Sequence, residues 1–204
     1  PEASHRDPDY QAGLLRLADK LRRIFNGGVD HRVLLVTGSG TALSECAIAS
    51  SVAAGQKLLV VDNGVFGARL AEIAALHEIA TVRVAYEAGQ VARVADVEAA
   101  LVADPAIRAV AVCHHETSVG LLNPIGQLGA LCRERGVLFL VDAVSSLGAE
   151  DLDVERDRVD LCWSSANKCL HAISGVGFVC VHPRVWPRID HIAPRSYYLD
   201  LRRY

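Results

Sequence analysis

Short runs of aliphatic residues, separated by segments with helical patterns, most constrain what this chain can fold into. Seven such runs occur, at 32–36, 57–61, 80–85, 108–112, 137–141, 159–163 and 177–181. Helical patterns lie between them or before them, at 11–25, 42–54, 64–77, 94–103 and 124–135. Strands that are apolar on both faces are typical of a parallel sheet covered by helices on each side. The pattern predicts a three-layer α/β fold with a mostly parallel, seven-stranded sheet.

Charge and cysteine usage narrow the function classes. The chain has 21 Lys and Arg against 24 Asp and Glu, a net charge of −3, which favours neither a nucleic-acid nor a membrane partner. No apolar run approaches the roughly 20 residues of a membrane-spanning helix. Six cysteines without a C-x-x-C pair are typical of reduced thiols in the core of a cytoplasmic protein. We expect a cytoplasmic protein that acts on small molecules.

Polar residues follow nearly every predicted strand. In open parallel sheets, ligands bind beyond the carboxyl ends of the strands, so these residues are expected to converge on one crevice. They are T-G-S-G-T at 37–41, D-N-G at 62–64, C-H-H-E-T-S at 113–118, D-A-V-S-S at 142–146 and S-S-A-N-K at 164–168.

The glycine-rich turn at 37–41 precedes a predicted helix. Its backbone N–H groups, the helix N-terminus and the hydroxyls of Ser39 and Thr41 could together hold a phosphate. The turn matches neither the G-x-G-x-x-G fingerprint nor a Walker loop. A simple helix cap after a strand is the alternative, and a nucleotide-binding α/β domain is a third class that depends on this turn alone.

Asp142 and Lys168 are the charged residues with the clearest chemical potential. Asp142 ends an entirely apolar strand, so its carboxylate needs hydrogen bonds or a cation, which a helix cap or a local arginine could also supply. Lys168 is either an idle surface lysine or, near a ligand phosphate, a candidate Schiff-base amine. A phosphate cup, a lysine, a carboxylate and a stacking aromatic such as Phe66 together suit pyridoxal phosphate. Phe66 taken alone is more typical of a core aromatic.

A metal site is not expected. The H-H-E cluster at 114–116 lacks the i, i+4 spacing of a helical zinc site, and no cysteine is placed to complete one. Cys169, beside Lys168, is interpreted as a small buried hydrophobe rather than a reactive thiol.

These motifs resemble those of class V aminotransferases, a branch of the fold-type I enzymes that use pyridoxal phosphate. The similar segments are S-H-R-D-P-D-Y at 4–10, T-G-S-G-T at 37–41, H-E-T-S-V-G at 115–120 and V-D-A-V-S-S at 141–146. The most specific is S-A-N-K-C-L at 165–170, which is similar to the lysine motif of the 2-aminoethylphosphonate–pyruvate transaminase subgroup. The segment L-L-N-P-I at 121–125 supports the same subgroup.

The resemblance implies roles for individual residues. Lys168 would bind the cofactor covalently and shuttle a proton, and Asp142 would pair with the pyridine nitrogen. The other implied contacts are the phosphate for Ser39, Gly40, Thr41 and, more weakly, Asn167, the ring face for Phe66, and the vicinity of the ring hydroxyl for Thr117.

The resemblance also implies a homodimer that uses a small-molecule amino donor and a 2-oxo acid acceptor. The expected reaction moves the amino group of 2-aminoethylphosphonate to pyruvate. An alanine- or serine–glyoxylate-type transaminase is the alternative, since H-A-I-S-G at 171–175 departs from the subgroup pattern. A second alternative is a non-catalytic protein of the same fold.

The ends of the chain bear on its domain organisation. The chain has no Met, begins at Pro1, and ends in a segment, 196–204, with helical content and no obvious partner. We expect 1–204 to be the cofactor-binding large domain, truncated at both ends. The family's small C-terminal domain, which would supply a substrate-binding arginine, is expected to be absent.

Overall fold

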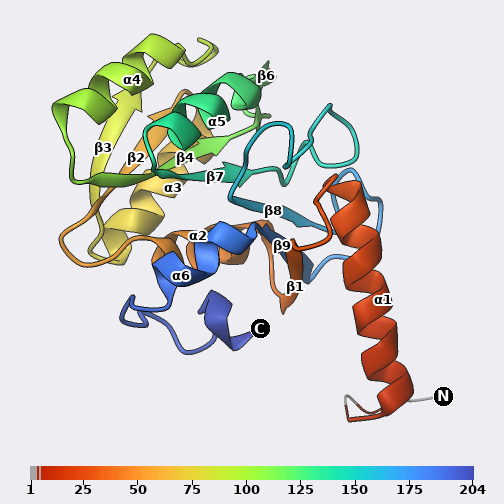
Figure 1. Ribbon diagram of the computed structural model, residues 1–204. Coiled ribbons are helices and arrows are strands. Elements are labelled where there is room, and N and C mark those ends of the chain that lie inside the picture. Colours follow the sequence, from red (N-terminus) through yellow and green to blue (C-terminus); the bar gives the residue numbers. More distant parts are fainter. Residues whose placement is uncertain (1–3, 5) are drawn as a thin grey trace.

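A seven-stranded sheet forms the centre of the molecule. The computed structural model describes residue 4 and residues 6–204, so His5 of the predicted N-terminal motif lies outside the described residues. The sheet has the order β1-β9-β8-β7-β4-β2-β3 (Figure 1). Its strands are β1 (Arg32–Thr37), β2 (Lys57–Asp62), β3 (Ala80–Ala85), β4 (Ile107–Cys113), β7 (Leu138–Asp142), β8 (Leu161–Ser165) and β9 (Val176–Val181).

The direction of the strands determines where polar loops meet. The pairs β2–β3, β2–β4, β4–β7 and β7–β8 are parallel, and β9 is antiparallel to both β8 and β1. Six strands therefore end at one edge of the sheet, and β9 starts there. This confirms the predicted mostly parallel sheet and places the five polar segments at a common edge.

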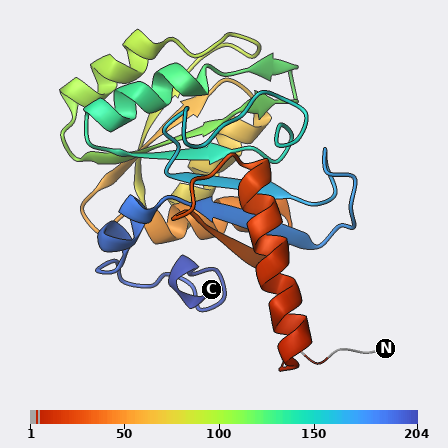
Figure 2. The same cartoon turned by 45° about the vertical axis from the view of Figure 1, so that its right-hand side comes forward.

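Helices cover both faces of the sheet and complete the three layers (Figures 1 and 2). On one face, α1 (Pro8–Ile24), α4 (Val94–Ala103) and α5 (Ile125–Glu134) contribute to one apolar core. On the other face, α2 (Gly40–Ser51), α3 (Val65–Leu76) and α6 (Trp186–Ile189) contribute to a second core. Neighbouring strand residues alternate between them, since Leu59 belongs to the first core and Leu58 to the second.

The observed boundaries differ from the predicted ones by at most three residues, and two of the differences have a clear local reason. Helix α1 begins at Pro8 rather than at 11, because the Asp7 side chain accepts the Asp9 N–H and Pro8 suits the first turn. The strand predicted at 159–163 begins at Leu161, because Val159 closes a local turn by donating its N–H to the Val154 carbonyl at 2.9 Å.

The segment predicted as a loop from 114 to 123 contains a small hairpin. Its strands are β5 (His115–Glu116) and β6 (Leu121–Leu122), which pair antiparallel. The hairpin follows β4 directly, so it lies at the same edge as the other polar segments. With so few residues in each strand, periodicity in the sequence could not reveal it.

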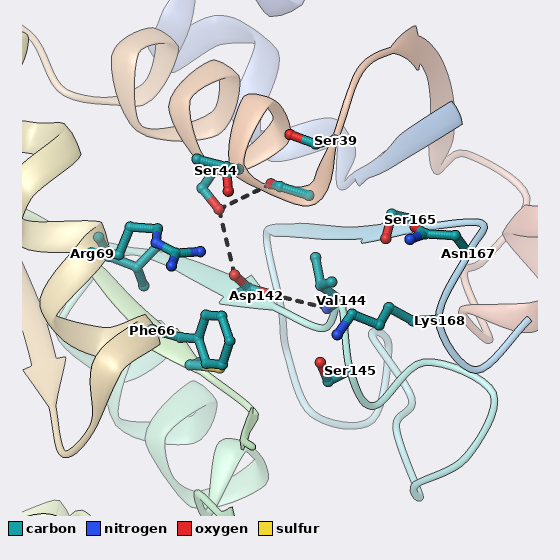
Figure 3. A pocket seen from close by; sticks show the side chains of 14 residues that line it. Ser39, Ser44, Phe66, Arg69, Asp142, Val144, Ser145, Ser165, Asn167 and Lys168 are labelled. Atoms are coloured by element: carbon teal, nitrogen blue, oxygen red, sulfur yellow. Dashed lines mark hydrogen bonds between the residues drawn. The ribbon is translucent and has the colours of Figure 1, made fainter. Parts of the chain in front are cut away.

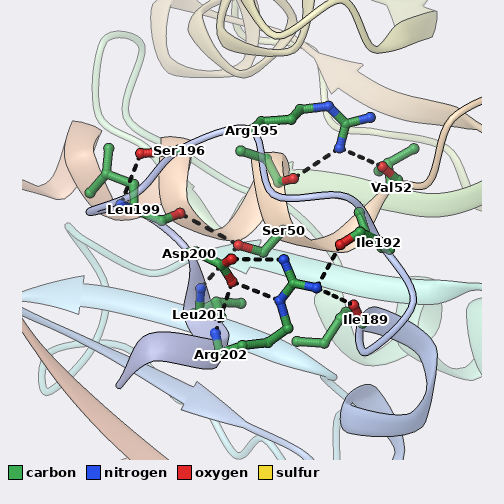
Figure 4. Close-up of polar contacts among 11 residues, drawn as sticks. Ser50, Val52, Ile189, Ile192, Arg195, Ser196, Leu199, Asp200, Leu201 and Arg202 are labelled. Carbon is green, nitrogen blue, oxygen red and sulfur yellow. Dashed lines mark hydrogen bonds and ion pairs between the residues drawn. The ribbon is translucent and has the colours of Figure 1, made fainter.

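The prediction that the tail 196–204 lacks a partner is wrong. Leu201 of the short 3-10 helix η2 (Leu201–Arg203) is fully buried in the core on the α2 face, and its N–H donates to the Ser50 hydroxyl at 3.1 Å (Figure 4). Arg195 donates to the carbonyls of Ala49 and Val52 at 3.0 and 2.7 Å. The tail thus packs against the C-terminal end of α2. The chain reaches it from β9 through the short 3-10 helix η1 (Pro183–Val185) and helix α6.

Two further observations concern the helices and the cysteines. Within the described ranges, no helix combines the length and apolarity needed to cross a membrane. All six cysteines are unpaired, and all but Cys169 are buried.

Candidate active site

A cavity of about 250 Å³ opens at the edge where the strands end (Figure 3). The residues predicted for the site that line it are Ser39, Gly40, Thr41, Phe66, Asp142, Asn167 and Lys168. They come from segments that are far apart in sequence, and the parallel order of the strands brings them together. Thr117 is exposed in the turn of the β5–β6 hairpin and does not belong to this lining, so its role near a ring hydroxyl stays a prediction.

The N-terminus of α2 forms one wall of the cavity. Ser39 is the N-cap, and its hydroxyl accepts the Ala42 N–H at 3.3 Å. At Gly40, a Cβ would lie 2.7 Å from Cγ2 of Val144, so a residue without a side chain lets the helix approach the loop after β7. The first-turn N–H groups and the hydroxyls of Ser39 and Thr41 make this wall suitable for an anion.

Asp142, the last residue of β7, is a buried carboxylate without a cation. It is 7% exposed, and its Oδ1 accepts the Val144 N–H at 2.9 Å. The Ser44 hydroxyl donates to its Oδ2 at the long distance of 3.4 Å. Burial raises the pKa of Asp142 to about 6, although both hydrogen bonds favour the charged form. None of the ion pairs among the described residues includes Asp142.

Ser44 is a site residue that the sequence reasoning missed. Its hydroxyl oxygen accepts the indole N–H of the fully buried Trp163 at 3.0 Å, and its proton is shared between Asp142 and the Gly40 carbonyl at 3.2 Å. The signal that could have found it is its place four residues after Gly40, which puts both on one face of α2. Ser44 connects the anion-binding wall to the carboxylate wall.

Lys168 lies in the loop after β8, and Figure 3 shows its side chain reaching into the cavity beside Val144 and Ser145. The loop is closed by backbone hydrogen bonds. Ala172 N–H donates to the Ala166 carbonyl at 2.9 Å, and His171, with φ of 53°, donates its N–H to the Lys168 carbonyl at 3.0 Å. The lysine is exposed and has no ion pair within the described part of the chain, so its amine is open to a ligand.

Phe66 and Arg69 come from the first turns of α3. Phe66 is half-buried and presents its ring to the cavity, and Cζ of Arg69 lies 5.0 Å from the centroid of that ring. Such a cation–π contact holds an aromatic ring in place. Arg69 is a second lining residue that sequence reasoning missed, and its only signal is the i, i+3 spacing from Phe66 on a helix.

The donor set fits pyridoxal phosphate. An anion-binding helix N-terminus, a lysine amine and an aromatic face surround a buried carboxylate whose desolvation an adjacent cation would offset. Those are the complements of a phosphate, an aldehyde, a planar ring and a protonated pyridine nitrogen. Among residue 4 and residues 6–204, no three His, Cys, Asp or Glu side chains gather to hold a metal ion.

Comparisons with known proteins show the family of the chain. The family model for class-V aminotransferases matches residues 3–200. The 2-aminoethylphosphonate–pyruvate transaminase of Salmonella paratyphi B is 38% identical over 176 residues, which cover 85% of this chain and 47% of that protein. The chain therefore spans about half the length of this curated relative.

Solved structures show the same fold. An aspartate aminotransferase of subgroup IV from Thermus thermophilus has a TM-score of 0.89 and 32% identity, over 100% of this chain and 56% of that one. The alanine–glyoxylate aminotransferase of Nostoc sp. has a TM-score of 0.93 and 29% identity, over 99% of this chain and 54% of that one.

Proposed function

The chain belongs to the class-V aminotransferase family, and on that basis we propose that it transfers the amino group of 2-aminoethylphosphonate to pyruvate, giving phosphonoacetaldehyde and L-alanine. Pyridoxal phosphate is the cofactor of the family. The observation that carries the proposal is the single cavity that Lys168, Asp142 and the N-terminus of α2 share. The choice of substrate is supported by the S-A-N-K-C-L segment at 165–170 and by the similarity to the Salmonella transaminase.

The two catalytic residues have complementary tasks. When bound, pyridoxal phosphate supplies an aldehyde that takes up amines and a ring that withdraws electrons from them. Lys168 would hold the aldehyde through Nζ until the amino donor replaces it, and the freed Nζ would then carry a proton to and from the substrate carbon. Asp142 keeps a proton on the pyridine nitrogen, because a cation next to the buried carboxylate removes the desolvation cost that raises its pKa to about 6.

Other residues bind and orient the cofactor. The first turn of α2, with Ser39, Gly40 and Thr41, holds the phosphate, and Phe66 stacks on the ring. Asn167 borders the cavity near Lys168, where it would contact the phosphate. Thr117 is exposed in the hairpin turn outside the cavity lining, so its contact with the ring hydroxyl requires the hairpin turn to approach the cavity. The Thr117 assignment is the first to test, with the substitution Thr117→Val.

We further propose that 1–204 is the cofactor-binding domain of the protein and that two copies associate as a homodimer. The dimer is supported by the exposed apolar side chains on α1, among them Tyr10, Leu14 and Leu17, and by the exposure of Lys168 on the open side of the cavity. A cytoplasmic location is supported by the unpaired state of all six cysteines.

An alanine- or serine–glyoxylate transaminase is the second candidate. It is favoured by the structural similarity to the Nostoc alanine–glyoxylate aminotransferase, at a TM-score of 0.93. A panel of amino donors separates the two reactions. Turnover of 2-aminoethylphosphonate with pyruvate, and none of alanine or serine with glyoxylate, would support the first reaction, and the reverse would replace it by the second.

The cofactor assignment has a direct test. Absorption spectra of the purified chain with pyridoxal phosphate are recorded before and after borohydride, and the modified lysine is mapped. A visible band and label on Lys168 are expected, and label on Lys20 or Lys57 would overturn the assignment. The same test on a version of the chain extended at both ends shows whether a failure to bind reflects a missing part or a non-catalytic chain.

A further inference from the structure

Glu116 is fully buried, yet it does not belong to the cavity lining. It lies on β5, and its carboxylate accepts the N–H of Phe66 at 3.1 and 3.3 Å and that of Gly67 at 2.9 Å. The Ser118 hydroxyl also donates to it. No arginine or lysine among the described residues forms an ion pair with Glu116. Its charge is compensated by the hydrogen-bond donors around it and by the positive end of α3.

The first turn of α3 depends on this carboxylate. Its N-cap is Gly64, which has no side chain to accept the free N–H groups of the helix. Glu116 accepts two of them from 50 and 49 positions away in sequence, and the Ser118 hydroxyl accepts the Val65 N–H at 3.1 Å. A Cβ at Gly64 would lie 2.4 Å from Cγ of Glu116, so glycine there lets the carboxylate reach the helix.

The residue held in this way is the one that presents its ring to the cavity. Phe66 receives the contact through its own N–H, so the position of its Cα is fixed relative to the hairpin. At Gly67, a Cβ would lie 2.7 Å from the Val61 carbonyl, so the helix also sits tightly on the end of β2. Movement of Phe66 therefore requires either the loss of the Glu116 contacts or a shift of the whole first turn.

The hairpin is joined to the opposite wall of the cavity as well. His114 donates its N–H to the Asp142 carbonyl at 2.9 Å, and its Nδ1 lies 3.0 Å from the Ser146 hydroxyl. His115 Nδ1 lies 3.2 Å from the Ser145 carbonyl. One short segment thus contacts both the end of β7 with the loop after it, where Asp142 lies, and the helix that holds Phe66.

We propose that Glu116 is a positioning residue that acts through Phe66, setting the stacking ring at a fixed distance from Asp142 so that both engage one cofactor ring. The proposal rests on the proposed function, because it concerns the same cofactor. It predicts that weakening the Glu116 contacts changes how the cofactor ring is held, beyond any change in folding stability.

The first test compares Glu116→Gln with wild type. The substitution keeps the shape but replaces one accepting oxygen by an NH₂ group that opposes the N–H donors of α3. The apparent Kd for pyridoxal phosphate is expected to rise about tenfold, the size of a lost aromatic stacking contact. Visible circular dichroism per bound cofactor is expected to fall by about half, since that signal reports how the ring is held by its asymmetric surroundings.

The matched control is Asp160→Asn. Asp160 is also a buried carboxylate, 1% exposed, and accepts the Phe139 N–H at 2.8 Å. Unlike Glu116, it also forms ion pairs with Arg133 and Arg184, and it precedes β8 at the opposite edge of the sheet. The Asp160→Asn substitution is expected to lower the free energy of unfolding while leaving the visible circular dichroism per bound cofactor unchanged. Equal loss of dichroism in both variants would overturn the proposal in favour of a general stability effect.

A double-mutant cycle tests whether Glu116 acts through Phe66. In a Phe66→Leu background, Glu116→Gln should weaken cofactor binding by less than twofold, because the stacking ring is already absent. A tenfold effect that persists in that background would overturn the proposal. An absence of any visible band in wild type contradicts the proposed function instead, whereas a normal band with an unchanged Kd in Glu116→Gln contradicts the positioning role alone.

Discussion

The hairpin after β4 and the end of β7 each contain a buried carboxylate, and the two carboxylates are satisfied by hydrogen bonds to very different degrees. Glu116, in the hairpin after β4, accepts two backbone N–H groups and a hydroxyl proton from its own chain. Asp142, at the end of β7, accepts one backbone N–H and a long hydroxyl contact, and burial raises its pKa to about 6.

This is the difference expected between a carboxylate with a structural role and one that binds a ligand. A buried charge needs donors or a cation, and where the chain supplies them the group serves packing and position. Where the chain leaves the charge incompletely compensated and adjoining a cavity, the missing partner is a ligand group of opposite charge. We call the hairpin after β4 the saturated region, because its buried carboxylate has all its hydrogen-bond donors from the chain. We call the end of β7 and the loops after β7 and β8 the open region, because the carboxylate there still lacks a partner.

The largest effect is expected from Lys168→Ala, in the open region. Loss of the amine should lower kcat by about 10⁴-fold, since both covalent binding of the cofactor and proton transfer depend on it. The free energy of unfolding should change by less than about 0.5 kcal/mol, because the side chain is exposed. Steady-state rates with urea denaturation measure both, and turnover near the wild-type rate would remove Lys168 from the mechanism.

Asp142→Asn should follow, with kcat lowered by about 10³-fold, the size of a lost electrostatic contact to a reacting group. The neutral amide keeps the shape but cannot stabilise a proton on the pyridine nitrogen. Ser44→Ala is the milder companion change, since it removes the hydroxyl donor 3.4 Å from Oδ2 without removing the charge. A lower kcat for Ser44→Ala than for Asp142→Asn would contradict the role proposed for the Asp142 carboxylate.

The stability of the cofactor-free protein should depend on pH through Asp142. Its folded pKa of about 6 lies above the ordinary value of 3.8, so its contribution is fully present below pH 3.8 and lost as pH rises through 6. The loss should approach about 3 kcal/mol by pH 8, at about 1.4 kcal/mol per pKa unit. Urea denaturation of wild type minus Asp142→Asn isolates this group, and a difference that stays flat from pH 4 to 8 would contradict the raised pKa.

Bound cofactor should remove most of that pH dependence, because a protonated pyridine nitrogen compensates the carboxylate. Denaturation with and without pyridoxal phosphate at pH 5 and pH 8 measures the change. A larger gain in stability at pH 8 than at pH 5 is expected, and equal gains would place the cofactor away from Asp142.

The smallest effect on chemistry is expected in the saturated region, from Asn123→Ala. Asn123 is 3% exposed, donates to the Cys113 carbonyl at 2.9 Å and accepts from Asn63 at 2.8 Å. Its removal leaves buried groups unsatisfied, so the free energy of unfolding should fall by about 2 kcal/mol. Activity per folded molecule should stay within about threefold of wild type, and a hundredfold loss would show that the hairpin takes part directly.

The sequence by itself determined the layers, the order of elements and most of the cavity lining. Apolar runs without alternation can be satisfied only inside a covered sheet, and parallel strands bring their carboxyl ends to one edge. That argument predicts that Ser39, Asp142 and Lys168 lie together, as they do in the cavity, and the S-A-N-K-C-L segment indicates the family.

Only the tertiary structure decided which buried polar side chains have hydrogen-bond partners and which groups of the chain those partners are. Glu116 caps a helix from about 50 positions away, Ser44 links Trp163 to Asp142, and the tail 196–204 docks on α2. These contacts join segments that no local pattern relates, and burial, which raises the pKa of Asp142, is a property of the assembled core. Sequence patterns report which groups must be inside, whereas the packed chain fixes which of them still need a partner.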